Sequence, residues 1–395
     1  MRDNRHGRIK LSCLLSAFLF SEKMEQRIKD LIEISRFYGN NPGYIIAGGG
    51  NTSFKNEEKL WIKASGSSLA VIDENGFVCL SRKELKKISE KTYSENSSER
   101  EAEVKADLHN AILYPENKRP SVETSLHEII TFPFVVHTHP TLVNALMCSN
   151  NAREMTLRLF GEEVLFVEYT DPGYVLFKKV ETEIIKYRKT RGKEPSVIFL
   201  QNHGVFVGAN SIAEIKTIYE GIEGKLRRCI SRPLPSAEEL PTEKGAGYLS
   251  EMLEKSFGVD PSGVLFTANE LVLSFVKNSE TFAKISKPFT PDDIVYCKSN
   301  YAFSPSGLGE MESVIKNFKS RCGYLPKVIA VQGEGLLVVE ESLKSAKTVQ
   351  EVFQNMMKVS FLSEDFGGPH FMTQRQIDFI DNWEVENYRR QVSKQ

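Results

Sequence analysis

Apolar and polar positions along the chain recur with different periods, and each period predicts a different kind of element. Apolar residues at helical spacing predict helices over residues 24–39, 99–114 and 180–189. Short runs rich in valine, isoleucine and phenylalanine predict strands over residues 44–46, 60–63, 134–139 and 197–200. Turns containing glycine, proline or asparagine punctuate these segments. Strands and helices are therefore both expected in the first half of the chain.

Three histidines stand at the ends of two of the predicted strands. His137 and His139 end the first one, and side chains two residues apart on a strand point to the same face. His203 follows the second one. Three imidazoles can hold a tetrahedral metal and leave one position open, which is the catalytic arrangement. A single histidine is more often an ordinary core or surface residue, but the His-x-His pair at a strand end favours a metal ligand.

Two loops rich in small residues are each predicted to follow a strand. The first begins at Ala47 and contains three consecutive glycines, then Asn51, Thr52 and Ser53. The second covers residues 64–68. Glycines let backbone amides approach an anion closely, and polar side chains add further donors. One such loop is a weak signal, whereas two of them favour a cradle for a phosphate or a carboxylate.

Glu123 lies in the first turn of a predicted helix that begins near Pro120. The helix dipole favours a carboxylate at this position, and that explanation alone is sufficient. The same helix leads directly into the strand of His137 and His139, so the alternative is that Glu123 faces the metal.

The second part of the chain repeats part of the first. Residues 195–222 align without gaps on residues 326–353 with ten identities, which indicates a duplicated strand–turn–helix unit. Glu334 stands where His203 stands in the first copy. A run over residues 294–298 is the candidate counterpart of the His-x-His strand, with Tyr296 and Lys298 replacing the histidines. The second copy is therefore predicted to lack the metal ligands.

The composition of the chain indicates which classes of partner and which cellular compartment to expect. The formal net charge of −1 and the dispersed lysines and arginines give no sign of a nucleic-acid partner. The six cysteines lie far apart, which is typical of reduced thiols in a cytoplasmic protein. An apolar run over residues 11–20 follows a basic stretch, but it is too short to span a bilayer and lacks a small-residue cleavage site. We therefore expect no membrane partner.

A tract rich in proline, serine and glutamate over residues 233–242 is the clearest linker. We predict an N-terminal tail over residues 1–23, a catalytic domain over residues 24–232 and a degenerate second domain over residues 243–395.

Taken together, the motifs resemble those of class II aldolase/adducin domains. Five of them occur in the family's order: Gly50-Asn51-Thr52-Ser53, Ser65-Gly66-Ser67, Pro120-Ser121-x-Glu123, His137-x-His139-Pro140 and Asn202-His203-Gly204. Within the family, the chain is most similar to the aldolase region of bifunctional rhamnulose-1-phosphate aldolase/alcohol dehydrogenase proteins, which also carry a second, degenerate copy. The resemblance covers nearly everything after residue 40, with residues 236–290 matching least clearly.

The resemblance implies a three-layer α/β/α fold with a mixed, largely antiparallel sheet. It implies that zinc or another divalent transition metal is held by His137, His139 and His203, with Glu123 as the acid/base. It also implies a substrate site whose residues are Gly50, Asn51, Thr52, Ser65, Gly66 and Ser121. Related fuculose-phosphate aldolases carry a second serine where Val122 stands here, which weakens the phosphate assignment relative to the metal assignment.

The expected reaction is retro-aldol cleavage of a ketose 1-phosphate, such as rhamnulose 1-phosphate, to dihydroxyacetone phosphate and an aldehyde. The expected protein is a cytoplasmic homo-oligomer of carbohydrate metabolism. Sibling activities on the same fold stay open, namely an epimerase, a dehydratase or a decarboxylase of sugar phosphates. A non-catalytic, adducin-like interaction module is the third alternative, but it would require missing ligands.

Overall fold

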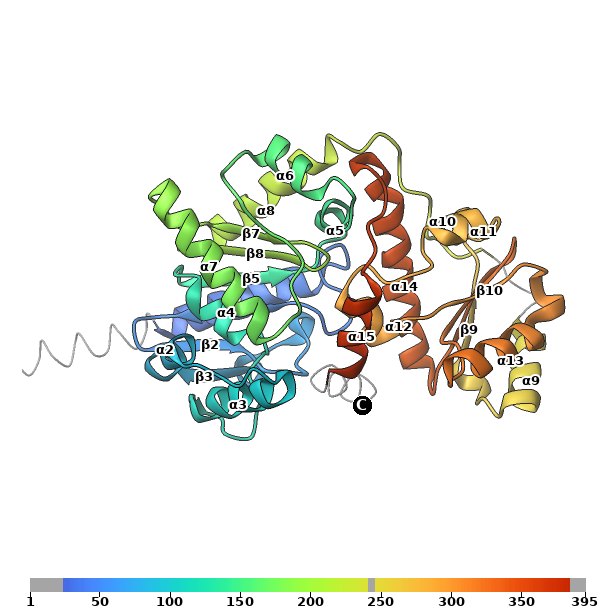
Figure 1. Cartoon of the computed structure of the whole chain (residues 1–395), viewed down its shortest axis with the longest axis horizontal. Helices are drawn as coiled ribbons and strands as arrows, with labels where there is room; N and C mark the ends of the chain where they lie inside the picture. The colour runs from blue at the N-terminus through green and yellow to red at the C-terminus, as the bar shows by residue number, and fades with distance from the viewer. Residues whose placement is uncertain (1–23, 241–245, 384–395) are drawn as a thin grey trace, which may run out of the picture.

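A computed structural model describes residues 24–240 and 246–383 of the chain, and the predicted tail over residues 1–23 lies outside them. The described residues build two β-sheets that follow one another in the sequence, with α14 and α15 lying between them (Figure 1). The domain boundaries given above stay predictions.

The first sheet has eight strands in the order β4-β3-β2-β1-β5-β8-β7-β6. β6 and β7 are parallel, and the other neighbouring strands are antiparallel. The strands are β1 (Asn51–Lys55), β2 (Lys59–Lys63), β3 (Phe77–Ser81), β4 (Ile112–Tyr114), β5 (Phe134–Thr138), β6 (Leu165–Val167), β7 (Val197–Leu200) and β8 (Gly204–Ala209).

Helices cover both faces of this sheet. Successive side chains of its buried strands point to opposite faces, so each face carries its own apolar cluster and each cluster packs against helices. One face packs against the helix over residues 24–39 and against α5 (Thr141–Met147), α6 (Ala152–Phe160) and α8 (Ile212–Arg227). The other face packs against α2 (Arg82–Glu90), α3 (Ser97–Asn110), α4 (Thr124–Ile129) and α7 (Tyr174–Arg191). The expected three-layer α/β/α domain with a mixed, largely antiparallel sheet is confirmed.

The second sheet has four strands in the order β10-β11-β12-β9, which repeats the order β6-β7-β8-β5. Its strands are β9 (Val264–Thr267), β10 (Ala302–Ser304), β11 (Val328–Val331) and β12 (Gly335–Val339). Its helices are α9 (Ala246–Phe257), α10 (Glu270–Phe275), α11 (Ser279–Ala283), α12 (Pro291–Cys297), α13 (Met311–Cys322), α14 (Leu343–Ser363) and α15 (Gln374–Asn382). Among the described residues, β10 and β11 form the only parallel pair of this sheet, as β6 and β7 do in the first one. The expected degenerate second copy is therefore present.

One expectation about the second copy is wrong. Residues 294–298 were the candidate counterpart of the His-x-His strand, but they belong to helix α12 and its C-cap, because Thr290 and Pro291 form a strong helix start. In the second sheet β12 pairs with β9, as β8 pairs with β5 in the first sheet. The register places Leu336 opposite Thr267, as it places Val205 opposite Thr138. The positions of His137 and His139 are consequently taken by Phe266 and Ala268.

Two local expectations in the first half also need correction. Residues 44–46 form no strand: Tyr44 ends a turn over residues 42–44, and the next two residues are irregular. Tyr44 and Ile45 are buried as anchors in front of the glycine loop, which leads into β1 instead of following a strand. The helix expected over residues 99–114 ends at Asn110, and the remaining residues add the edge strand β4 to the sheet.

The two halves share buried apolar surface. α14 packs along α5, and Leu362 and Phe366 at the end of this helical stretch join the core of the first sheet. Backbone hydrogen bonds extend the contact, with His370 N donating to Cys148 O over 2.7 Å and Asn150 N donating to Gly368 O over 3.0 Å. Among the described residues, no helix combines the length and the apolar content that crossing a bilayer requires.

Candidate metal centre and its pocket

The three histidines meet at one end of the first sheet. His137 lies on β5 and His139 follows directly after its end. The tight turn between β7 and β8 carries His203, whose backbone N–H donates to Leu200 O over 3.2 Å. One nitrogen of each ring lies within 4.8 Å of the others. His137 is completely buried, whereas the side chains of His139 and His203 are each 15% exposed. The sheet thus brings together residues that are 66 positions apart in the sequence (203 − 137).

The hydrogen bonds around the triad determine which ring nitrogens carry the proton. His137 Nδ1 lies 3.0 Å from Val205 O, and His139 Nδ1 lies 2.7 Å from Asp292 Oδ2. Both oxygens can only accept, so in the neutral rings each Nδ1 carries the proton and each Nε2 carries a lone pair. The two Nε2 atoms nevertheless lie 2.9 Å apart. Two lone pairs at this distance repel one another, and a shared cation removes the repulsion.

Glu123 completes the same centre. Its Oε1 lies 3.3 Å from His137 Nε2 and 3.4 Å from His203 Nε2, and this buried oxygen has no hydrogen-bond partner. Burial lowers the pKa of His203 to about 3, so this imidazole is neutral at pH 7 and does not neutralise the carboxylate. A buried carboxylate oxygen among imidazole lone pairs is the environment that a divalent cation stabilises. The residues therefore fit a metal.

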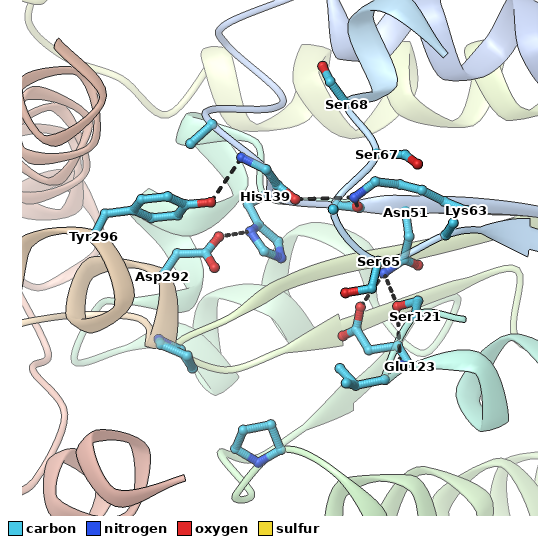
Figure 2. Close-up of a pocket in the computed structure, with 18 of the residues that line it drawn as sticks. Asn51, Lys63, Ser65, Ser67, Ser68, Ser121, Glu123, His139, Asp292 and Tyr296 are labelled. Carbon is cyan, nitrogen blue, oxygen red and sulfur yellow. Dashed lines mark hydrogen bonds and ion pairs between the residues drawn. The ribbon is translucent and has the colours of Figure 1, made fainter. Parts of the chain in front are cut away.

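The helix-dipole explanation of Glu123 does not account for this geometry. Glu123 is the N-cap residue of α4, but its side chain makes no capping hydrogen bond. The carboxylate points to the histidines instead, and its Oε2 accepts a hydrogen bond from Asn51 Nδ2 (Figure 2).

His127 orients Asn51, and sequence analysis missed it. This histidine is fully buried, and burial holds its pKa well below the usual range. Its Nε2 contacts Asn51 Oδ1, and its Nδ1 lies 2.7 Å from Ser53 Oγ. With its oxygen engaged, Asn51 directs its amide N–H groups at Glu123 and at Ser121 Oγ, the latter over 3.1 Å. In the sequence His127 is one more residue on an amphipathic helix, so only the packing of α4 against β1 reveals this contact.

A pocket opens beside the triad and is lined by the two small-residue loops (Figure 2). Its lining includes the predicted residues Gly50, Asn51, Ser65, Gly66, Ser121, Glu123, His139 and His203, together with Ser67 and Ser68. Gly50 has a φ of +68°, and a Cβ at this position would lie 2.8 Å from His137 O. Buried Lys63, another residue that sequence analysis missed, donates from Nζ to Gly48 O over 3.2 Å and to Gly50 O over 2.9 Å, which fixes the glycine loop.

Thr52 is the one predicted substrate-binding residue that the structure does not bring to the pocket. Successive side chains of β1 point to opposite faces of the sheet, so Thr52 points away from the face of Asn51 and Ser53. Thr52 is fully buried, and its hydroxyl lies 2.6 Å from Ser35 Oγ.

The second half of the chain supplies one wall of the pocket. The contributing residues are Pro291, Asp292, Tyr296, Lys344, Thr348 and Trp383. Tyr296 Oη accepts a hydrogen bond from Gly48 N over 3.0 Å (Figure 2). Sequence patterns do not predict the role of Asp292 in the pocket, because Thr290-Pro291-Asp292-Asp293 is an ordinary helix start.

Comparisons with known proteins match the first half of the chain. The family model described as "Class II Aldolase and Adducin N-terminal domain" matches residues 29–228. An uncharacterized oxidoreductase of Bacillus subtilis, YuxG, is 24% identical over 192 residues; these are 46% of this chain and only 26% of that protein, so the chain spans about a quarter of its length. The N-terminal class II aldolase domain of a conserved protein from Thermoplasma acidophilum is 24% identical, with a TM-score of 0.43 over 51% of this chain and 92% of that one. An L-fuculose-1-phosphate aldolase from Thermus thermophilus is 15% identical, with a TM-score of 0.35 over 51% and 93% of the two chains.

Proposed function

This chain belongs to the class II aldolase and adducin family, and we propose that it is a metal-dependent aldehyde-lyase that cleaves a ketose 1-phosphate by a retro-aldol reaction. The observation that carries the proposal is the position of Glu123 Oε1, which lies 3.3 and 3.4 Å from two histidine nitrogens and lacks a hydrogen-bond partner. An interaction module without catalysis has no need of a buried carboxylate among three convergent imidazoles, because such a group costs stability.

The chain's own residues divide the work as follows. His137, His139 and His203 would hold the divalent metal, which would supply a Lewis acid for the oxygen that gains charge as the C3–C4 bond breaks. Glu123 Oε1 accepts the proton of the C4 hydroxyl as the C3–C4 bond breaks and returns it to C3 of the enediolate, and Asn51 holds the other carboxylate oxygen in place.

The small-residue loops anchor the phosphate. Ser65, Gly66 and Ser121 line the pocket together with Gly50 and Asn51, and they offer hydroxyl, amide and backbone N–H donors without a bulky side chain. An anchored phosphate would fix the distance of the reacting carbons from Glu123 and from the metal. Binding of the phosphate would therefore orient the substrate before the reaction. Dihydroxyacetone phosphate and an aldehyde are the products of this reaction, and rhamnulose 1-phosphate is the substrate that we would test first.

The proposal is tested by product identification. The purified protein, loaded with Zn²⁺, is incubated with a panel of ketose 1-phosphates, and the release of dihydroxyacetone phosphate is followed with a coupled dehydrogenase. We expect release from at least one ketose phosphate and none from the chelator-treated protein. A product with the carbon chain intact would instead identify an epimerase or a dehydratase, and release of carbon dioxide from a keto-acid phosphate would identify a decarboxylase. Sedimentation analysis of the same sample tests the expected homo-oligomer.

A further inference from the structure

The second half of the chain touches a candidate metal ligand directly. Asp292 lies in the first turn of α12, and its Oδ2 is 2.7 Å from His139 Nδ1 (Figure 2). Its neighbour Asp293 performs the capping of this helix, since Thr290 and Asp293 form the capping box. The contact of Asp292 with the histidine is therefore separate from the capping box of α12, and the dipole of α12 alone does not explain where the carboxylate points.

The surroundings of this contact are tightly packed. A Cβ at Gly49 would lie 3.1 Å from Asp292 Oδ2 and 3.3 Å from His139 Nδ1, so the glycine loop passes close beside the hydrogen bond. One turn further along α12, Tyr296 Oη accepts from Gly48 N over 3.0 Å. α12 thus binds both the metal-ligand strand and the loop in front of it.

A second ligand is also tied to this half of the chain. Asn202, immediately before His203, has a φ of 54°, a conformation that asparagine tolerates better than most residues. Its Nδ2 donates to Phe289 O over 3.0 Å and to His370 O over 2.9 Å, and both acceptors belong to the second half. Two of the three candidate ligands therefore depend on contacts across the interface between the halves.

From these contacts we propose that Asp292 is a positioning residue for His139, and that the affinity of the centre for a divalent metal depends on this carboxylate from the degenerate copy. The inference rests on the metal centre of the proposed function. A carboxylate on Nδ1 fixes the tautomer that leaves Nε2 free, holds the ring in one orientation and makes Nε2 more basic. The duplicated half would then have lost its own ligands and kept a role at the ligands of the first copy.

The experiment measures the dissociation constant for Zn²⁺ by competition with a chromogenic chelator, without any substrate. The variants are Asp292→Ala and the near-isosteric Asp292→Asn, whose amide oxygen still accepts from Nδ1. The matched control is Asp171→Asn. Asp171 lies at the same interface, its side chain is 13% exposed against 16% for Asp292, and it pairs with Arg375 of α15 at 2.8 Å.

We expect Asp292→Ala to raise the dissociation constant about 10- to 100-fold, the usual loss when a metal-bound histidine loses its carboxylate partner. Asp292→Asn should cause a smaller rise, and Asp171→Asn should leave the constant within about twofold of the wild-type value. The visible spectrum of the Co²⁺-loaded protein should also change in Asp292→Ala, because the field at His139 changes.

Two results would overturn the inference. One is a wild-type dissociation constant for Asp292→Ala. The other is an equal loss in all three variants, which would assign the effect to docking of the halves. A wild-type protein that binds Zn²⁺ but cleaves no ketose phosphate would refute the proposed function and leave the role of Asp292 standing.

Discussion

Replacing Glu123 by glutamine separates proton transfer from metal binding, because the change removes a charge at the centre of the site and leaves all three histidines in place. The glutamine oxygen can still accept from Asn51 Nδ2, as Glu123 Oε2 does now. The lost group is the free carboxylate oxygen 3.3 Å from His137 Nε2. A missing general acid/base lowers turnover by about two to four decades. This loss corresponds to about 2.7–5.4 kcal/mol in the activation barrier.

The assay compares turnover, metal content and unfolding by urea in the same preparations. The Zn²⁺ content should stay near one per chain, and the free energy of unfolding should change by less than about 1 kcal/mol, because the Glu123 side chain makes no capping hydrogen bond. The matched control is Glu334→Gln, the same change at the position that aligns with His203 in the second copy; its Oε1 accepts from Leu308 N over 3.1 Å, away from the histidines. Turnover within tenfold of wild type in Glu123→Gln would refute the assignment. An equal loss in Glu334→Gln would show that the second copy contributes chemistry.

Three further predictions follow from the same contacts. His203→Ala should lose bound metal and turnover together, as measured by metal analysis of the dialysed protein; loss of turnover with full metal content would contradict its role as a ligand. In the metal-free protein, burial lowers the pKa of both His203 and His127 below the ordinary value of 6.5. Below this pH the two histidines therefore bind protons in the unfolded chain before they do so in the folded chain. Stability should therefore fall as the pH drops below about 6.5, by up to about 1.4 kcal/mol per pH unit for each histidine; urea unfolding at several pH values tests this, and His203→Gln should reduce the slope. Ser121→Ala should raise KM for the sugar phosphate, whereas Thr52→Val should leave KM unchanged and cost about 1 kcal/mol of stability through the lost bond to Ser35; a matching rise in KM for both variants would contradict the placement of Thr52.

Sequence reasoning succeeded where the relevant residues are close in the chain or follow one period. The His-x-His spacing places two of the three convergent histidines together, and the gapless repeat over residues 326–353 predicts β11, β12 and the start of α14. It failed at Thr52 because a motif does not say which of its residues face the site. In β1 that is decided by pairing, where Asn51 lies opposite His137 and Thr52 opposite Val136.

The contact of the second half with the histidines could not be predicted from the sequence, for a different reason. Asp292 is 153 positions from His139, and its sequence neighbourhood is fully explained by helix capping. Nothing in the periodicity of either segment encodes how the two halves dock. The docking surface becomes recognisable only when α14 is placed along α5 and the backbone of residues 366–370 along residues 148–151.

The degenerate copy also bears on what shapes the metal centre. A Cβ at Gly204 would lie 2.5 Å from Thr138 O, and a Cβ at the aligned Gly335 would lie 2.5 Å from Thr267 O. The two strand pairs therefore approach equally closely, although Phe266 replaces His137 in the second copy and packs into an apolar cluster. Since the close approach persists where the ligands are lost, backbone packing rather than metal binding maintains it. In the first copy the same packing holds the imidazoles together, so a divalent metal would bind a preformed site in a fold that does not depend on the metal.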